Sequence, residues 1–122
     1  MKYGWFSVLG VVLIAACGSP GSSKHATVAQ KGETLRPGTK VIDVRTPAEY
    51  QAGHIPGVVN IPLNELEQRI SEVASSKNTC LAIHCQSGKR SATAKQTLER
   101  LGYVNVDDLG SLAHARQVVL GE

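Results

Sequence analysis

Aromatic residues and strong charge are both scarce in this chain of 122 residues. Only 4% of the residues are aromatic, and the formal net charge is +3. Tyr3, Trp5 and Phe6 lie close to the amino terminus, which leaves Tyr50 and Tyr103 for the remaining sequence. Two scattered tyrosines cannot form a platform for stacking bases, and so mild a charge does not indicate a polyanionic partner. We therefore expect no nucleic-acid function.

An apolar run long enough to cross a membrane is also missing. Residues 3–16 are apolar apart from Gly and Ser, but a membrane-spanning helix needs about 20 such residues. Because Met1 and Lys2 precede this run, it resembles the core of a signal peptide. Its last residues, Ile14-Ala15-Ala16-Cys17, resemble the lipobox of bacterial lipoproteins. An ordinary secretory signal with an incidental cysteine is the alternative.

The lipobox resemblance implies that residues 1–16 are removed and that Cys17 carries a lipid. The protein would then be periplasmic and anchored to the bacterial membrane. Gly18 follows the cysteine where an Asp would retain the protein at the inner membrane, which favours the outer membrane. Residues 17–33 are rich in Gly, Ser and Lys and have few large apolar side chains. They are predicted to form a flexible tether in front of a folded domain at 34–122.

Cysteine is scarce as well, with three in the chain. If Cys17 is lipidated, Cys80 and Cys85 remain, and both fall on one predicted strand. At about 3.3 Å per residue they lie roughly 16 Å apart, whereas a disulfide needs Cα atoms within about 7 Å. We therefore expect Cys85 to be a free thiol, which in an oxidising compartment suggests chemistry, and Cys80 to be a buried inert cysteine.

Strand and helix patterns alternate from about residue 34 onward. Short β-branched or apolar runs predict strands, and apolar residues at helical spacing between capping signals predict helices. The expected strands are 41–44, 58–61, 80–84 and 103–106. A first helix is expected to start at Thr46, with Thr46 as the N-cap, Pro47 at the first position and Glu49 three residues after the cap. Further helices are expected at 63–73, 91–101 and 112–120. This alternation predicts an α/β domain with a mostly parallel central sheet flanked by helices.

The segment 81–91 carries the strongest chemical signal. An apolar strand ends at Cys85, and a short basic loop leads directly into a predicted helix. A thiol at such a place meets helix-start amides and positive charge, which favour the nucleophilic thiolate. Loop amides can face the sulfur, glycine permits the tight loop, and the basic side chains attract an anion. The candidate substrate-binding residues of the loop are Gln86, Ser87, Gly88, Lys89 and Arg90. The alternative is an ordinary cysteine followed by a solvated Lys-Arg pair.

A second polar segment, Asp43-Val44-Arg45, ends the first predicted strand. Ligands of open α/β sheets bind beyond the carboxyl ends of the strands, so Arg45 is expected near Cys85. It either binds an anionic substrate or forms a structural ion pair with Asp43 or Glu49. His84 directly precedes Cys85, but successive strand side chains point to opposite faces. We therefore do not expect His84 to act on the sulfur.

Residues 42–62, from Ile42-Asp43-Val44-Arg45-Thr46-Pro47-Ala48-Glu49 to Val59-Asn60-Ile61-Pro62, resemble the amino-terminal signature of the rhodanese family. Residues 85–91, Cys-Gln-Ser-Gly-Lys-Arg-Ser, resemble its active-site loop. The resemblance runs from about Leu35 to the carboxyl terminus and is strongest to periplasmic single-domain rhodaneses of the phage-shock-protein type.

This resemblance implies a three-layer rhodanese-like domain and a thiosulfate sulfurtransferase. A sulfane sulfur would pass through a Cys85 persulfide to cyanide or a thiol, with no metal or organic cofactor, in a protein expected to be a monomer. The sequence departs from the family near its end. Leu109-Gly110-Ser111-Leu112 stands where a Gly-Gly pair is usual, and the tryptophan that commonly follows is missing, which puts the packing of the last helix in doubt.

Two other functions fit part of the pattern. His84-Cys85 followed by Arg90-Ser91 resembles the signature of phosphatases and arsenate reductases, but only four residues separate Cys85 from Arg90, one fewer than that signature has. The smaller loop suits a single sulfur atom better than a phosphoryl group. A non-catalytic, lipid-anchored binding module is the other alternative, and the intact Cys85 loop argues against it.

Overall fold

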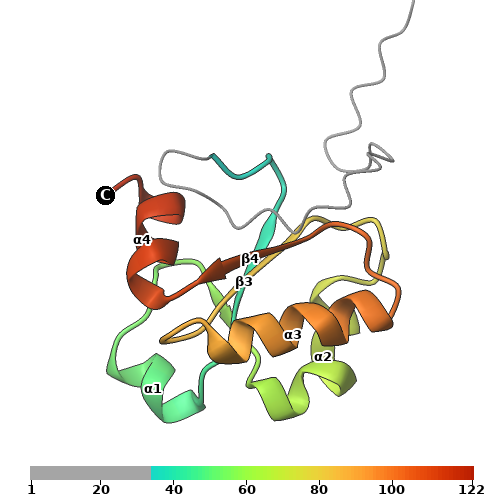
Figure 1. Ribbon diagram of the computed structural model, residues 1–122, viewed down its shortest axis with the longest axis horizontal. Coiled ribbons are helices and arrows are strands. Elements are labelled where there is room, and N and C mark those ends of the chain that lie inside the picture. Colours follow the sequence, from blue (N-terminus) through green and yellow to red (C-terminus); the bar gives the residue numbers. More distant parts are fainter. Residues whose placement is uncertain (1–33) are drawn as a thin grey trace, which may run out of the picture.

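The computed structural model describes residues 34–122 (Figure 1). The predicted signal peptide, the lipidated Cys17 and the tether lie outside the described residues and stay predictions. The elements in chain order are β1 (Lys40–Asp43), α1 (Pro47–Ala52), β2 (Val59–Asn60), a 3-10 turn η1 (Leu63–Glu65), α2 (Leu66–Val73), β3 (Leu81–His84), α3 (Lys89–Arg100), β4 (Val106–Gly110) and α4 (Leu112–Leu120).

The four strands form one sheet in the order β2-β1-β3-β4, and every pair is parallel. This confirms the predicted α/β architecture. The strands β1 and β3 are central, and Asp43 is in register with His84. Because both strands run in the same direction, the segments that follow them leave the sheet at one edge. That edge brings Arg45 and Cys85 together.

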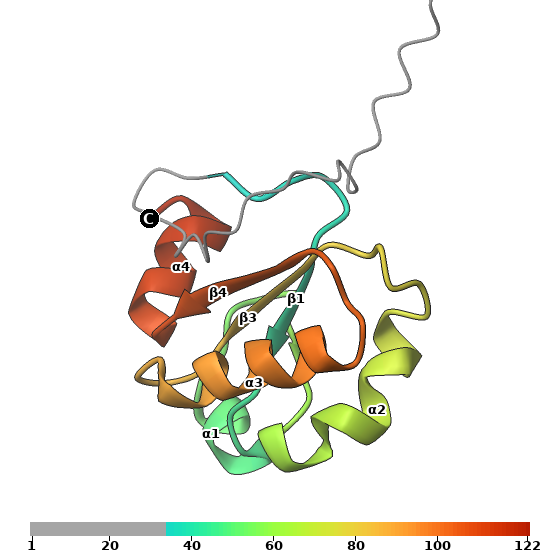
Figure 2. The same cartoon turned by 45° about the vertical axis from the view of Figure 1, so that its right-hand side comes forward.

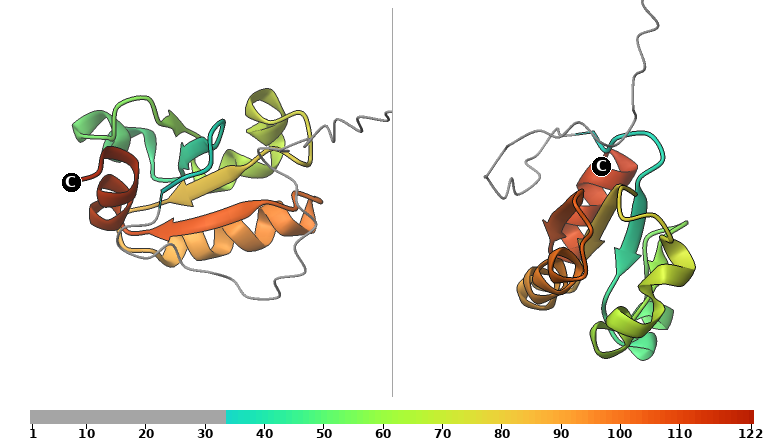
Figure 3. Two further views of the ribbon diagram at one scale, coloured as in Figure 1. Left: turned by 90° about the horizontal axis from the view of Figure 1, so that it is seen from above. Right: turned by 90° about the vertical axis from the view of Figure 1, so that its right-hand side faces the viewer.

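Helices cover both faces of the sheet, as the three-layer prediction requires. On one face, apolar side chains of β1 and β3 pack with those of α2 and α3, among them Ile42, Ile83, Ile70 and Leu98. On the other face, Ala82 and Leu109 pack with side chains of α4. Figure 2 shows α2 beside α3, and Figures 1 and 3 show α4 at the opposite end of the domain from α2.

The strand β3 passes through the middle of the protein, and all four of its residues are buried. Alternation along the strand places Leu81 and Ile83 in the layer of α2 and α3, and Cys85 belongs to the same cluster. His84 is buried as well, and alternation directs it toward the opposite face. The nucleophile candidate therefore lies beneath α3.

Most predicted boundaries differ from those of the structure, and two of the differences have a clear physical cause. The helix expected at 91–101 begins earlier, at Lys89, because Gly88 adopts a left-handed conformation (φ 102°) and turns the loop directly into the helix. The strand expected at 103–106 is β4, which begins only at Val106. Tyr103 instead fills the core, where its hydroxyl donates to the carbonyl of Ala74. The apolar pair Tyr103-Val104 favours a strand in the sequence, but Tyr103 packs in the core and Val104 is exposed.

The capping prediction for α1 is confirmed. Thr46 is the N-cap, Pro47 opens the helix, and Glu49 and Thr46 form a reciprocal capping box. The last helix, α4, has the predicted bounds and is capped by the Ser111 hydroxyl, which accepts from the N–H of His114. Within residues 34–122, no helix is long and apolar enough to cross a membrane.

Candidate active site

Cys85 lies at the point where β3 passes into the loop before α3. Its side chain is fully buried. The sulfur accepts a hydrogen bond from the backbone N–H of Gly88 at 2.9 Å and lies 3.7 Å from the hydroxyl oxygen of Ser91. The Ser91 hydroxyl in turn donates to the carbonyl of Gly88 at 3.0 Å. The loop therefore folds back on the sulfur and surrounds it with hydrogen-bonding groups.

The conformation of Gly88 makes this arrangement possible. Its φ of 102° lies in the left-handed region, which side chains disfavour. A Cβ at this position would lie 3.7 Å from the Cα of Gly110, which is ordinary van der Waals contact. The backbone angle, rather than a lack of space, is what requires glycine here. This angle directs the Gly88 N–H at Cys85.

The surroundings of Cys85 favour its thiolate. Burial acts to raise the pKa of the thiol, but hydrogen bonds from the Ser91 backbone and hydroxyl and from the N–H groups of Gly88 and Ser87 outweigh it. The pKa of Cys85 is therefore lowered from its usual value of 9.0. The start of α3, which has no acidic residue in its first turn, adds the positive end of a helix dipole. This geometry favours the thiolate of Cys85, which is the nucleophilic form of cysteine.

Of the two cysteines within residues 34–122, Cys85 alone is a free thiol. The prediction that Cys80 and Cys85 do not bridge each other is confirmed. Cys80 is buried, as expected, and it is not a free thiol.

Arg45 is buried and forms the structural ion pair that was one of its two predicted roles. Its Nε and Nη2 atoms donate to the carboxylate of Asp43 at 2.8–3.0 Å, and Asp43 is fully buried. The guanidinium also donates to the side-chain oxygen of Gln86 at 3.1 Å and to the carbonyl of Gly53 at 2.7 Å. Arg45 thereby fixes the first residue of the Cys85 loop to the edge of the sheet.

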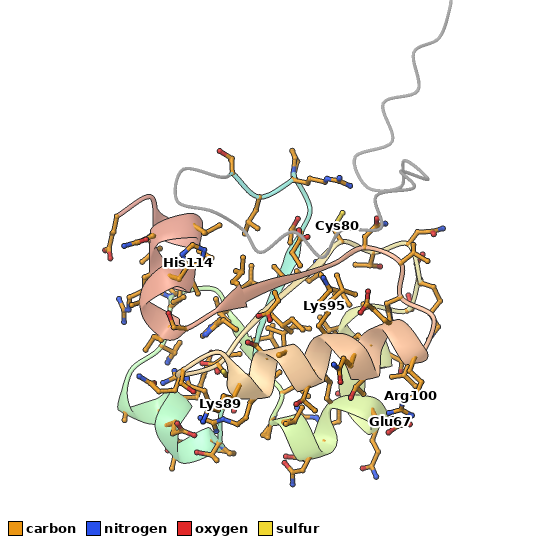
Figure 4. The ribbon with its side chains drawn as sticks, in the orientation of Figure 1. Glu67, Cys80, Lys89, Lys95, Arg100 and His114 are labelled. Atoms are coloured by element: carbon orange, nitrogen blue, oxygen red, sulfur yellow. The ribbon has the colours of Figure 1, made fainter. Side chains whose placement is uncertain are left out.

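Arg90 is paired at the other end of the loop. Its two terminal nitrogens donate to the two carboxylate oxygens of Glu49, at 2.7 and 2.9 Å. Lys89 is exposed and forms no ion pair within the described part of the chain. Figure 4 shows it at the start of α3. Of the two basic residues predicted to attract an anion, Lys89 is therefore the one whose charge is not balanced by a carboxylate.

The β4–α4 junction closes the remaining side of the loop. Gln86 accepts from the N–H of Leu112 at 3.2 Å, Cys85 donates its N–H to Gly110 at 3.0 Å, and Ser87 pairs with Ser111 in an isolated antiparallel bridge. These contacts are made by the backbone. The departure from the usual family residues at this junction therefore leaves the rim intact.

His84 stays apart from the sulfur. Its Nδ1 lies 3.2 Å from the carbonyl oxygen of Cys85, and its Nε2 lies 3.8 Å from the Asp43 carboxylate without a hydrogen-bond partner. Burial lowers the pKa of His84, which favours the neutral ring. None of the interactions of residues 34–122 joins this ring to the Cys85 sulfur. Nor do these residues contain a cluster of side chains that could hold a metal ion.

Two features of the site differ from what the sequence favours. For Ser91 the sequence favours a helix-cap role over a hydrogen bond to the sulfur, but Ser91 is buried beside Cys85 in the first turn of α3. The earlier start of the helix is the reason, and a left-handed Gly88 was the available signal. Glu49 was interpreted through its capping box, which is local. Its second partner, Arg90, lies 41 positions away and gave no sequence signal.

The chain is similar to a known protein family and to characterised relatives. The family model for the rhodanese-like domain matches residues 15–111. The chain is 41% identical over 71 residues to the thiosulfate sulfurtransferase PspE of Escherichia coli K12, covering 58% of this chain and 68% of the relative. It is 36% identical over 100 residues to thiosulfate sulfurtransferase 16, chloroplastic, of Arabidopsis thaliana, covering 72% of this chain and 80% of the relative.

A solved structure agrees with these matches. The fold is similar to that of a structure described as a rhodanese with anions from E. coli, with a TM-score of 0.60 and 38% sequence identity. The superposition covers 62% of this chain and 89% of that one. The predicted three-layer fold is thereby confirmed.

Proposed function

Because this chain belongs to the rhodanese-like sulfurtransferase family, we propose that it moves the sulfane sulfur of thiosulfate to cyanide or a thiol through a persulfide on Cys85. The observation that carries this proposal is the position of the Cys85 sulfur. It is a free thiol of lowered pKa, held 2.9 Å from an inward-facing backbone N–H in a four-residue loop. The loop offers a cradle for one sulfur atom.

The first half of the reaction is a displacement at sulfur. The Cys85 thiolate attacks the outer sulfur of thiosulfate, a new S–S bond forms, and the old S–S bond breaks. Its electron pair leaves with sulfite, and Cys85 carries a persulfide. The amides of the loop donate to the anionic sulfur, as oxyanion-hole donors do to oxygen. The exposed Lys89 attracts the dianionic donor.

The second half restores the enzyme. Cyanide attacks the terminal sulfur of the persulfide, and the S–S bond breaks. Thiocyanate leaves, and the electron pair of the broken bond stays on the Cys85 sulfur, which is again a thiolate. A thiolate acceptor gives an acceptor persulfide in the same way. Electrons balance in each half without a metal or organic cofactor. Arg45 serves both halves by keeping Gln86, and with it the loop, in place.

The pairing of Arg90 with Glu49 argues against the phosphatase alternative. A phosphatase arginine binds the phosphoryl group from within the loop, but both terminal nitrogens of Arg90 are engaged by Glu49. Because the loop is one residue short and its arginine is occupied, the geometry favours sulfur over phosphate.

Turnover of thiosulfate with cyanide, measured as thiocyanate formation, tests this function. We expect activity in the wild type and none in Cys85→Ser, which removes the nucleophile and keeps the shape of the side chain. Cys85→Ser should unfold at a temperature similar to that of the wild type. A parallel assay with a phosphate ester should show no hydrolysis. Ester hydrolysis without sulfurtransfer would contradict the proposal.

We also propose that Cys17 carries a lipid and holds the domain at the periplasmic face of the membrane, where it acts as a monomer. The support is the Ile14-Ala15-Ala16-Cys17 sequence. Membrane fractionation and mass spectrometry of the mature amino terminus test this, and Cys17→Ser should release the protein into the soluble fraction. Recovery of the wild-type protein in the soluble periplasmic fraction, with an unmodified amino terminus, would contradict the proposal.

A further inference from the structure

Three charged side chains surround the outer end of the Cys85 loop: Lys89, Arg90 and Glu49. Two of them cancel each other. Arg90 and Glu49 form a two-pronged ion pair, with contacts of 2.7 and 2.9 Å and side chains that are each 34% exposed. The local sum of charges is therefore +1, although the loop itself contributes two positive residues.

The carboxylate of Glu49 is firmly placed and remains ionised. Its Oε1 accepts from the backbone N–H and the hydroxyl of Thr46, each at 3.1 Å, in addition to Arg90. The hydrogen bond with Arg90 is the main reason that the pKa of Glu49 is lowered to about 2. The carboxylate of Glu49 is thus negatively charged at neutral pH.

Arg90 lies close to the reacting sulfur, because it directly precedes Ser91 in the first turn of α3, and the Ser91 hydroxyl oxygen lies 3.7 Å from that sulfur. The hydrogen bond with Glu49 is the main cause that raises the pKa of Arg90, and the charges of Glu49 and Cys85 add to it. A change in the net charge of this pair should therefore change the electrostatic potential at the Cys85 sulfur. Stability does not explain the pair, because half-exposed ion pairs contribute about 0–1 kcal/mol.

We propose that Glu49 is a specificity-determining residue that sets the charge at the mouth of the Cys85 site. By balancing Arg90, it leaves one net positive charge, carried by Lys89, and so limits the preference for doubly charged donors over partners of lower charge. This role of Glu49 rests on the proposed sulfurtransfer function. A dianionic donor must enter, but sulfite, also a dianion, must leave, and acceptors of lower charge, such as cyanide, must reach the same sulfur.

Alkylation of Cys85 measures this charge without relying on sulfurtransfer. Iodoacetate carries one negative charge and iodoacetamide none, so the ratio of their rate constants reports the potential at the sulfur. At low ionic strength we expect Glu49→Gln to raise the ratio about threefold and Arg90→Gln to lower it about threefold. The double variant Glu49→Gln/Arg90→Gln should return to the wild-type ratio.

Glu67→Gln is the matched control. Glu67 pairs with Arg100 at the far end of α3, at 3.5 Å, with both side chains more than half exposed. Figure 4 shows this pair at the opposite end of α3 from Lys89. The substitution changes the charge of the protein as Glu49→Gln does, but about 15 Å away along the helix. The alkylation ratio should stay at the wild-type value.

The same variants should also change the steady-state kinetics with thiosulfate. Coulomb energy is proportional to charge, so the energy change for dianionic thiosulfate is twice that for singly charged iodoacetate. A threefold effect on iodoacetate therefore corresponds to about a tenfold effect on kcat/KM for thiosulfate. For Glu49→Gln we expect a lower KM together with a lower kcat, since sulfite is retained more strongly. Salt near 1 M should remove these differences.

Each contrary result has a distinct meaning. If Arg90 bound the donor directly, the double variant would match Arg90→Gln instead of the wild type, and the proposal would fail. If Glu49 were only structural, Glu49→Gln would slow both reagents equally and leave the ratio unchanged, which would overturn it too. Should Glu49→Gln not fold, Lys89→Gln must still lower the ratio about threefold, as expected for the one unbalanced charge. A wild type inactive with thiosulfate would refute the proposed function, while the alkylation ratios would still decide the role of Glu49.

Discussion

Two arginine–carboxylate pairs hold the two ends of the Cys85 loop, and they differ in burial. Arg45 and Asp43 are 3% and 0% exposed, and their pair fixes Gln86 at the start of the loop. Arg90 and Glu49 are each 34% exposed, and their pair lies where the loop enters α3. The same chemistry therefore serves two purposes. The buried pair determines position, whereas the half-exposed pair contributes mainly charge.

The largest expected effect comes from breaking the buried pair. Arg45→Ala leaves the Asp43 carboxylate buried without its partner, which typically costs about 3–5 kcal/mol. The free energy of unfolding, measured with urea, should fall by that amount. Arg90→Ala is the matched control at the half-exposed pair and should cost less than about 1 kcal/mol. Equal losses from the two substitutions would contradict the distinction between the pairs.

Arg45→Lys sharpens the same comparison. Lysine keeps the positive charge but lacks the planar fork that reaches Asp43, Gln86 and Gly53 together. We expect it to recover part of the stability lost in Arg45→Ala but not the sulfurtransfer activity. Full recovery of activity would mean that charge alone, and not the position of Gln86, is what Arg45 supplies.

A change in the length of the loop between the two pairs should have a smaller effect. Inserting one glycine between Ser87 and Gly88 moves Arg90 to the phosphatase spacing and enlarges the ring of amides around Cys85. We expect thiosulfate turnover to fall at least tenfold, or about 1.4 kcal/mol of barrier. An insertion variant that stays folded and turns over at the wild-type rate would remove loop length as the reason for sulfur selectivity.

The hydrogen bonds to the sulfur predict a pH effect. Because the pKa of Cys85 is lowered from 9.0, alkylation by neutral iodoacetamide should rise with pH and reach half its maximum below pH 9.0. Ser91→Ala removes one of the groups that lower this pKa, so its half-maximum should move to higher pH. Ser87→Ala, whose contribution comes from the backbone, is the control and should leave it unchanged. A shift to lower pH in Ser91→Ala would contradict the assigned role of Ser91.

The sequence predicted those parts of the molecule that depend on local signals. Alternating apolar strands and helices gave the parallel sheet, and Thr46, Pro47 and Glu49 gave the start of α1. Cys85 was identified because a strand, a thiol, a glycine loop and a helix follow one another directly. These features are encoded within a few neighbouring residues.

Features that depend on distant partners could not be predicted in the same way. Whether Arg45 binds substrate or Asp43 is decided by burial, which a single arginine does not reveal. The pairing of Glu49 with Arg90 requires α1 and the start of α3 to meet in space. The start of α3 at Lys89 depends on a left-handed Gly88, and apolar Tyr103 was taken for a strand residue because its role in the core is tertiary.

The most direct test of the account is the mass of the Cys85 peptide after thiosulfate treatment without an acceptor. The account predicts a gain of one sulfur atom on that peptide, loss of that atom on addition of cyanide, and no gain in Cys85→Ser. A protein that consumes thiosulfate while its Cys85 peptide keeps its original mass, or that carries the added sulfur on Cys80, would contradict it.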